Sequence, residues 1–417
     1  MILAIEMLLY AIIGLVSVYA FRHYVFTWIR LFRPPRDPYR DIDAADWPTV
    51  TVQIAAHNEE RVIRYCLDAL LTVDYPLDRL VIMPVNDRSV DATREIIDAY
   101  VERYPGLIRP FHRTGGKPGK AAALKDAAAF VDSDILIVFD ADYVPSRGLI
   151  RQLVAPFFDP EVGAVMGRVV PLNADRGLLT RLLDIERSGG YQVDQQARMT
   201  LQLVPQYGGT TGGVRLAALN AIGGWSDDVL AEDTELTYRL LLRGWKTAYQ
   251  NRAECYEEVP ENWQVRSRQI ARWAKGHNQS LARHFWGVIG SRRLRGIEKI
   301  DAVLLLCVYL MPALTLSALT LIILLFYLGR PLPFDGLLLG LGVFLYGSLG
   351  NFAAFFELAA GCYLDDKRAS ARLLPLNLLG FVTSVVAVTR ATLEQLLFDR
   401  LFRREFVWHK TVRYRAS

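Results

Sequence analysis

The sequence predicts an α/β domain flanked by transmembrane helices, and two observations carry this prediction. The chain has 417 residues, of which 52% are hydrophobic and 22% charged, and its mean hydropathy of +0.17 is high for a soluble protein. The apolar residues gather at the two ends of the chain, while short β-rich runs alternate with helical patterns between them. Such alternation is typical of a parallel sheet covered by helices.

The composition excludes two other classes of protein. A disordered chain combines low hydrophobicity with a high net charge, whereas this chain has a formal net charge of only +4. Its four cysteines, at positions 66, 255, 307 and 362, show no metal-ligand spacing. A disulfide scaffold and a structural zinc module are therefore not expected.

The first apolar segment, residues 7–21, contains no charged residue. A cleaved secretory signal begins with basic residues, but here they follow the apolar run, as Arg22, Arg30, Arg33, Arg36 and Arg40. Under the positive-inside rule this order predicts an uncleaved anchor over residues 1–29, with its N-terminus outside. A domain over residues 30–262 would then face the cytoplasm, which also suits free cysteines.

Within this domain, four continuous apolar runs are typical of buried parallel strands: residues 50–56, 80–85, 135–139 and 163–170. Helical patterns lie between them, at residues 58–71, 90–104 and 118–131. This order predicts right-handed βαβ units. Because ligands bind at the carboxyl ends of the strands in such sheets, polar residues directly after a strand are the first candidates for a functional site.

Three polar clusters follow these strands: His57-Asn58-Glu59-Glu60, Asn86 to Asp91, and Asp140-Ala141-Asp142. Helix capping is a sufficient explanation for Asn58, Ser89 and Asp91. It does not explain Asp140 and Asp142, because two carboxylates at the mouth of a buried strand repel each other unless a cation lies between them. Such oxygen ligands suit Mg²⁺ or Mn²⁺, which usually share their coordination with substrate phosphates.

A glycine-rich turn with two lysines, Gly115 to Lys120, opens the helical segment at 118. A turn of this kind at a helix N-terminus favours anions, although a solvated basic turn would look the same. It is not a Walker A loop, because Ala121 follows Lys120 where that motif has Ser or Thr.

Two later segments carry further candidates. Glu232 and Asp233 begin an amphipathic helix, where acidic residues are often partners of the helix dipole rather than catalytic bases. Gln269, Arg272 and Trp273 have the spacing of one helix face. Together they could clamp a diphosphate and stack on a sugar, or they could belong to an ordinary amphipathic surface helix.

Residues 265–300 contain nine Lys or Arg and one acidic residue, interleaved with aromatic residues. A nucleic acid could bind such a stretch, but an apolar run long enough to cross a bilayer begins directly after it. We therefore expect residues 263–300 to form helices on the anionic membrane surface, and we expect no nucleic-acid partner.

Three apolar runs follow this stretch, at residues 302–329, 336–356 and 373–389. Three crossings would place the end of the chain outside, yet residues 399–417 contain six Lys or Arg against two acids, which is typical of a cytoplasmic tail. We therefore predict a membrane unit over residues 301–398, in which 373–389, the weakest run, is a re-entrant or in-plane element, followed by a basic cytoplasmic tail.

Eight motifs between about residues 49 and 280 resemble those of the membrane-integrated family 2 glycosyltransferases, which include cellulose, hyaluronan and mannan synthases. In order they are HNE, NDRS, GGKPGKAAAL, DAD, YGGTTGG, GGW, AED and QIARW. The order and spacing of DAD, AED and QxxRW are the specific part of the match. GGTTGGVRLAALNAIGGW and the tail EFVWHKTVR are similar to the mannan-synthase-like branch.

The resemblance implies a Rossmann-like, nucleotide-sugar-binding GT-A fold and a set of site residues. Asp233 would be the general base on the acceptor hydroxyl, and Asp140 and Asp142 would hold Mg²⁺ or Mn²⁺ on the diphosphate. The nucleotide-binding residues would be Glu59, Asp87, Lys120, Gln269 and Arg272. The acceptor-binding residues would be Gly209, Thr210, Glu232 and Trp273.

The resemblance also implies processive, inverting transfer of a sugar to a β-linked polysaccharide at the inner membrane. The sequence departs from the family pattern at Ala55, where Pro is common, and at Asn86 and Arg88, where the family has Asp and a small residue. These departures leave the donor open between UDP-glucose, which we favour, and GDP-mannose.

Two alternative functions remain open. One is a non-processive enzyme that adds one sugar to a membrane lipid, as ceramide glucosyltransferases do. The other is a transport or scaffold component with an inactive transferase domain, against which the intact acidic and QxxRW motifs argue. A homo-oligomer and export partners are both compatible with the sequence.

Overall fold

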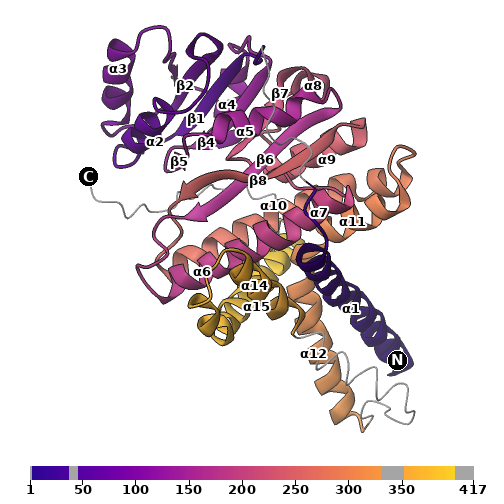
Figure 1. Cartoon of the computed structure of the whole chain (residues 1–417). Helices are drawn as coiled ribbons and strands as arrows, with labels where there is room; N and C mark the ends of the chain where they lie inside the picture. Colours follow the sequence, from indigo (N-terminus) through magenta and orange to yellow (C-terminus); the bar gives the residue numbers. More distant parts are fainter. Residues whose placement is uncertain (1, 37–45, 330–351, 400–417) are drawn as a thin grey trace.

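The computed structural model describes residues 2–36, 46–329 and 352–399, and these form a sheet domain and a group of long helices (Figure 1). The helical group contains both ends of the described chain. Helix α1 (Ile2–Phe32) lies beside α12 (Met311–Tyr327), and both extend away from the sheet domain.

The sheet has eight strands in the described residues, in the order β3-β2-β1-β4-β7-β6-β8-β5. Their bounds are β1 (Val50–Ala56), β2 (Leu80–Asp87), β3 (Phe111–Arg113), β4 (Ile135–Asp140), β5 (Val144–Pro145), β6 (Val162–Pro171), β7 (Gly212–Arg215) and β8 (Lys246–Glu257). Strands β1 to β4 pair in parallel, whereas β7 is antiparallel to both β4 and β6. The parallel half places the carboxyl ends of β1, β2 and β4 at one edge.

The four predicted strands are present as β1, β2, β4 and β6, and the α/β fold class is confirmed. Their side chains alternate between two cores, as a strand buried on both faces requires. In β4, for example, Ile137 and Phe139 belong to one core, and Leu136 and Val138 to the other.

Helices cover both faces of the sheet. The first core includes α2 (Ile63–Leu70), α3 (Thr93–Arg103) and α5 (Leu149–Val154). The second includes α4 (Lys120–Ala128), α8 (Leu216–Ala221) and α9 (Glu232–Arg243). Two short 3₁₀ helices, η1 (Leu77–Arg79) and η2 (Ala155–Phe158), complete this domain.

Two long helical segments run between the sheet domain and the other helices (Figure 1). One is α6 (Leu178–Ser188), which continues through the π-helical segment η3 (Gly189–Gln195) into α7 (Gln196–Leu201). The other is α10 (Trp263–Gly290), followed by α11 (Gly296–Leu306) and η4 (Val308–Leu310). The last elements of the described part of the chain are α14 (Ala353–Leu364), η6 (Ser370–Leu376), α15 (Asn377–Glu394) and η7 (Gln395–Asp399).

Three helical stretches of the described chain are long and apolar enough to cross a membrane: Ile2–Phe32, Val308–Tyr327 and Ser370–Leu397. The run 373–389, predicted to be re-entrant or in-plane, lies within the third stretch, whose 28 residues suffice for a crossing by length and composition. The run 336–356 lies mostly outside the described residues, as does the basic tail.

Candidate active site

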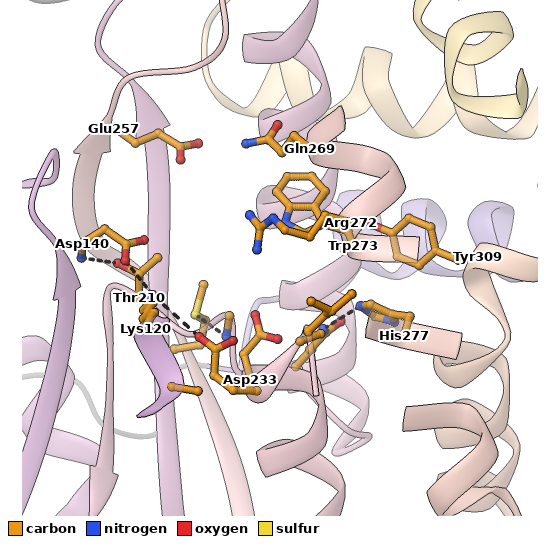
Figure 2. A pocket seen from close by; sticks show the side chains of 18 of the residues that line it. Lys120, Asp140, Thr210, Asp233, Glu257, Gln269, Arg272, Trp273, His277 and Tyr309 are labelled. Atoms are coloured by element: carbon orange, nitrogen blue, oxygen red, sulfur yellow. Dashed lines mark hydrogen bonds and ion pairs between the residues drawn. The ribbon is translucent and has the colours of Figure 1, made fainter. Parts of the chain in front are cut away.

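A cavity of about 1100 Å³ lies between the carboxyl ends of the strands and helix α10. Its walls also come from η3, from the first turn of α9 and from the 206–210 loop. Figure 2 shows Asp140 and Lys120 on one side of it, Gln269, Arg272 and Trp273 on the other, and Asp233 at its base. The motifs separated in sequence thus meet in one place.

Lys120, the first residue of α4, connects two of these motifs. Its ammonium Nζ lies 2.6 Å from Oδ1 of Asp140 and donates a hydrogen bond of 2.8 Å to the carbonyl oxygen of Gly209. Burial lowers the pKa of Lys120, but the carboxylates of Asp140 and Glu232 outweigh burial, so that its pKa is raised. Lys120 is therefore a permanent positive charge within the cavity.

Asp140 ends β4, and Asp142 follows two residues later; both line the cavity. The backbone N–H of Asp140 donates to the hydroxyl of Thr210 over 3.2 Å, which ties this strand end to the 206–210 loop. No group of three or more His, Cys, Asp and Glu side chains in the described residues could hold a metal ion by itself. Two carboxylates suit a divalent ion that takes its other ligands from a diphosphate, and one of them, Asp140, pairs with the ammonium of Lys120.

Asp233 lies in the first turn of α9, where its Oδ1 accepts hydrogen bonds from the backbone N–H of Thr234 (2.6 Å) and from its hydroxyl (3.3 Å). Burial raises the pKa of Asp233, although Thr234, Lys120 and Arg272 act in the opposite direction. A carboxylate with a raised pKa in a cavity is a better proton acceptor than an exposed one. Glu232 lies beside it and also lines the cavity.

Gly209 makes room for this carboxylate. Its φ is +72°, a conformation that favours glycine, and a Cβ built there would lie 3.0 Å from Cβ and 3.2 Å from Oδ2 of Asp233. Gly209 does not itself line the cavity, whereas its neighbour Thr210 does. Gly209 therefore leaves room for the Asp233 carboxylate, and its carbonyl oxygen accepts the hydrogen bond from Lys120.

Helix α10 presents Gln269, Arg272 and Trp273 to the cavity (Figure 2). Its first turn is capped by Asn262, whose side chain accepts a hydrogen bond from the backbone N–H of Gln264. Arg266 lies over the ring of Trp273, 5.3 Å from its centroid, and donates to Oε1 of Gln269. These contacts hold the amide and the indole in fixed orientations toward the cavity.

The two residues expected near the nucleotide base differ in their position relative to the cavity. Glu59 lines the cavity, but Asp87 does not. Asp87 is buried, with Oδ1 at 2.8 Å from both Arg88 and Arg113, and its Oδ2 accepts from the backbone N–H of Gly119. These partners hold its pKa below the ordinary value against the effect of burial. Asp87 thus supports the turn before Lys120.

Several lining residues were not expected from the sequence. Glu257, at the end of β8, accepts from Tyr143 (2.6 Å) and from Nε of Arg187 (2.7 Å), and Arg187 also lies over the ring of Trp273. Residue Tyr143 directly follows Asp142, so these contacts connect the DAD segment to the QxxRW helix. The polar strand β8 carries no apolar pattern that would have identified Glu257.

The cavity continues toward the long helices. Arg22 of α1 and Glu357 of α14 line its far end, together with Asp194 and Arg198. Arg22 pairs with Asp194, and Arg198 lies 2.5 Å from Asp301 and 2.9 Å from Asp194. Side chains from near both ends of the chain therefore border the same space as Asp233.

The sequence of the chain is similar to those of known proteins. Residues 48–276 match the sequence profile described as "Glycosyltransferase like family 2". The chain is 36% identical over 260 residues to the probable glycosyltransferase YdaM of Bacillus subtilis, covering 62% of this chain and 60% of that protein. It is 28% identical over 290 residues to the probable glucomannan 4-beta-mannosyltransferase 1 of Arabidopsis thaliana, covering 66% and 52% respectively. The chain thus spans about half to three fifths of the length of these relatives.

Among solved structures, the mannosyltransferase PcManGT from Pyrobaculum calidifontis, in complex with GDP-Man and Mn²⁺, has a similar fold. The two superpose with a TM-score of 0.59 at 22% sequence identity, over 87% of this chain and 98% of the other. This likeness confirms the expected GT-A fold.

Proposed function

Because this chain belongs to glycosyltransferase family 2, we propose that it transfers a hexose from a nucleotide sugar to a growing β-linked polysaccharide at a membrane. The single observation that carries this proposal is the shared cavity lined by the Asp233 carboxylate, the Asp140–Lys120 pair and the Arg272 guanidinium. Inverting sugar transfer needs a base on one side of the reacting carbon and positive charge on the other.

In this proposal Asp233 takes the proton of the acceptor hydroxyl as its oxygen forms a bond to the anomeric carbon. The bond from that carbon to the phosphate oxygen breaks, and the nucleoside diphosphate leaves with its negative charge. Lys120, Arg272 and Gln269 bind the leaving diphosphate. A divalent ion at Asp140 and Asp142 would neutralise further charge on the diphosphate when bound.

The remaining assignments follow the same reasoning. Glu59 borders the nucleotide, and Asp87 acts by supporting the turn at Gly119. Trp273, Thr210, Glu232 and Gly209 shape the acceptor side. The similarity to glucomannan 4-beta-mannosyltransferases of Arabidopsis thaliana favours a mannosyl donor, and hence GDP-mannose over the UDP-glucose expected from the sequence.

We further propose that the helical stretches Ile2–Phe32 and Val308–Tyr327 cross the inner membrane, with the sheet domain in the cytoplasm and α10 and α11 at the membrane surface. A second candidate function is the addition of one sugar to a membrane lipid. The reach of the cavity to Arg22 and Glu357, on helices near both ends of the chain, favours an acceptor that approaches from the membrane side in either case.

The test is a donor screen on membranes that contain the protein. GDP-mannose and UDP-glucose are each supplied with Mn²⁺ or Mg²⁺, and nucleotide release and labelled product are measured. We expect release from one donor and a ladder or insoluble polymer, while a single glycolipid spot would favour the second candidate. Membranes with Asp233→Asn should release no nucleotide, and the exposed Asp175→Asn should match the wild type. Absence of release from both donors would contradict the proposal.

A further inference from the structure

His277 lies one helical turn after Trp273 on α10, and it faces the first turn of α9 rather than solvent. Its Nε2 is 3.1 Å from the hydroxyl of Thr234 and 3.3 Å from Nε2 of Gln206. Gln206 in turn donates a hydrogen bond of 2.9 Å to the same hydroxyl. His277 and Gln206 therefore both contact one fully buried hydroxyl group.

That hydroxyl is directly connected to the proposed base. Thr234 contacts Oδ1 of Asp233 through its backbone N–H, at 2.6 Å, and through its hydroxyl, at 3.3 Å. Oδ2 of the same carboxylate lies toward Gly209, on the side of the loop that lines the cavity. The path from His277 through Thr234 thus holds one oxygen of Asp233 and leaves the other for the acceptor.

The position of His277 is restricted from two sides. The preceding residue, Gly276, lies so close to the α9 turn that a Cβ there would be 2.5 Å from Cβ of Ala231 and 2.7 Å from its backbone nitrogen. On its other side the imidazole packs against the ring of Tyr309, with 4.6 Å between centroids. Figure 2 shows His277 and Tyr309 together, on the side of Asp233 away from Asp140.

His277 interacts here as a neutral group. Burial lowers its pKa to about 4, so that near pH 7 the imidazole carries no charge. Its Nδ1 has no hydrogen-bond partner in the described part of the chain. The contribution of His277 to the site therefore passes through Nε2.

We propose that His277 is a positioning residue, which fixes the orientation of the Asp233 carboxylate through the Thr234 hydroxyl. This proposal rests on the proposed function, in which Asp233 is the base. Removal of Nε2 would let the Thr234 hydroxyl rotate and the carboxylate turn away from the acceptor. Misplacement of a reacting group by about 1 Å can cost about 100-fold in rate.

The test compares His277→Gln with His277→Asn in membranes, with the donor that the wild type uses. A glutamine amide reaches the position of Nε2, whereas an asparagine amide reaches only that of Nδ1. We expect kcat to fall about 100-fold in His277→Asn with an unchanged donor KM, and to be largely restored in His277→Gln. Binding of GDP or UDP to each variant reports that the site is still folded.

The pH profile and a double-mutant cycle separate positioning from a general packing role. Loss of the hydrogen bond from Thr234 makes the ionised form of Asp233 less favourable, so the acid limb of kcat should move to higher pH in His277→Asn. Lys120, Glu232 and Arg272 also face Asp233 and are unchanged in this variant. Thr234→Val should have a similar effect, and the double variant Thr234→Val/His277→Asn should be no worse than either single variant.

The outcomes distinguish the two proposals. Transfer that persists in Asp233→Asn would remove the base assignment, and the positioning role with it, while the transferase function would stand; no nucleotide release by the wild type would remove that function. If Asp233→Asn is inactive but His277→Asn keeps the wild-type kcat, the positioning role is wrong. It is also wrong if the Gln and Asn variants are equally impaired, or if the losses from Thr234→Val and His277→Asn multiply.

Discussion

The ammonium group of Lys120 lies 2.6 Å from Oδ1 of Asp140, at the end of the strand that carries the DAD motif. Lys120, which is expected to bind the diphosphate, thus contacts Asp140, which is expected to bind the metal. A divalent ion and Lys120 would compete for the same carboxylate, while both would attract the same diphosphate.

Lys120→Met should change metal affinity and donor affinity in opposite directions. Without the ammonium, Asp140 is more available to Mn²⁺, so half-saturation should need less metal. The diphosphate loses a charged partner, so the donor KM should rise by about tenfold, as expected for a charged hydrogen bond. Titrations of Mn²⁺ and donor in membranes measure both quantities.

Lys125→Met is the matched control, because Lys125 lies on the same helix but pairs with Asp227 and is half-exposed. It should leave both quantities unchanged. Weaker binding of metal and donor together in Lys120→Met would contradict competition at Asp140.

The acid limb of the pH–rate profile should have its midpoint above the ordinary pKa of an aspartate, which is about 3.9. Asp233 must be ionised to accept a proton, and burial raises its pKa, so activity is lost at a higher pH as the medium is acidified. Burial and the charge of Asp233 also raise the pKa of Glu232. By the same repulsion, Glu232→Gln should move the limb to lower pH. A limb that stays in place in this variant would show that Glu232 does not interact with the titrating group.

Arg272→Lys should lower kcat by about 100-fold, which is the usual loss when one donor to a developing charge is removed. Lysine keeps the charge but loses the planar, two-pronged geometry that matches a phosphate. Arg268→Lys on the same helix is the control, since Arg268 is exposed and does not line the cavity. Single-turnover measurements with saturating donor would follow the chemical step, and an unimpaired Arg272→Lys would argue against contact with the diphosphate.

Gly276→Ala should impair catalysis through the contact between α10 and α9. The new methyl group would lie 2.5 Å from Cβ of Ala231, and relief of this overlap must move one element. We expect a lower thermal midpoint, from an overpacking cost of about 1–3 kcal/mol, together with a lower kcat. Gly290→Ala on the same helix meets no atom within 4 Å and should be neutral. Wild-type kcat in Gly276→Ala would show that this contact does not govern the site.

The strands that the sequence predicted well are those with continuous apolar runs. Strands β1 and β4 are buried on both faces, so that most of their residues are apolar, and Val50–Ala56 was predicted to the residue. Strand β8 was missed because its sequence, KTAYQNRAECYE, is polar, and pairing with β6 and β5 rather than its own pattern makes it a strand. Strand β7 contains Gly212, whose Cβ would be 2.6 Å from the ring of Tyr207, so a close approach rather than β-propensity selects the residue.

The residues of the candidate site also divide into those that the sequence pattern could identify and those that it could not. Asp140, Asp233 and Arg272 could be found because each belongs to a short motif at a predictable position in an element. Glu257 and His277 have no such motif, and they reach the cavity only because β8 and α10 fold against segments distant in sequence. Asp87 was predicted as a site residue from its motif, and this stays a prediction; sequence spacing could not show that its carboxylate pairs with Arg88 and Arg113.

Arg22 and Glu357 lie more than 330 residues apart in sequence and yet border the same cavity as Asp233. The pocket is therefore complete only when α1 and α14, which are far apart in the sequence, have both packed into place. A copy in which either helix is unpacked would lack part of the cavity wall. Formation of the cavity is therefore coupled to assembly of the helical group, because the same two helices supply part of its wall.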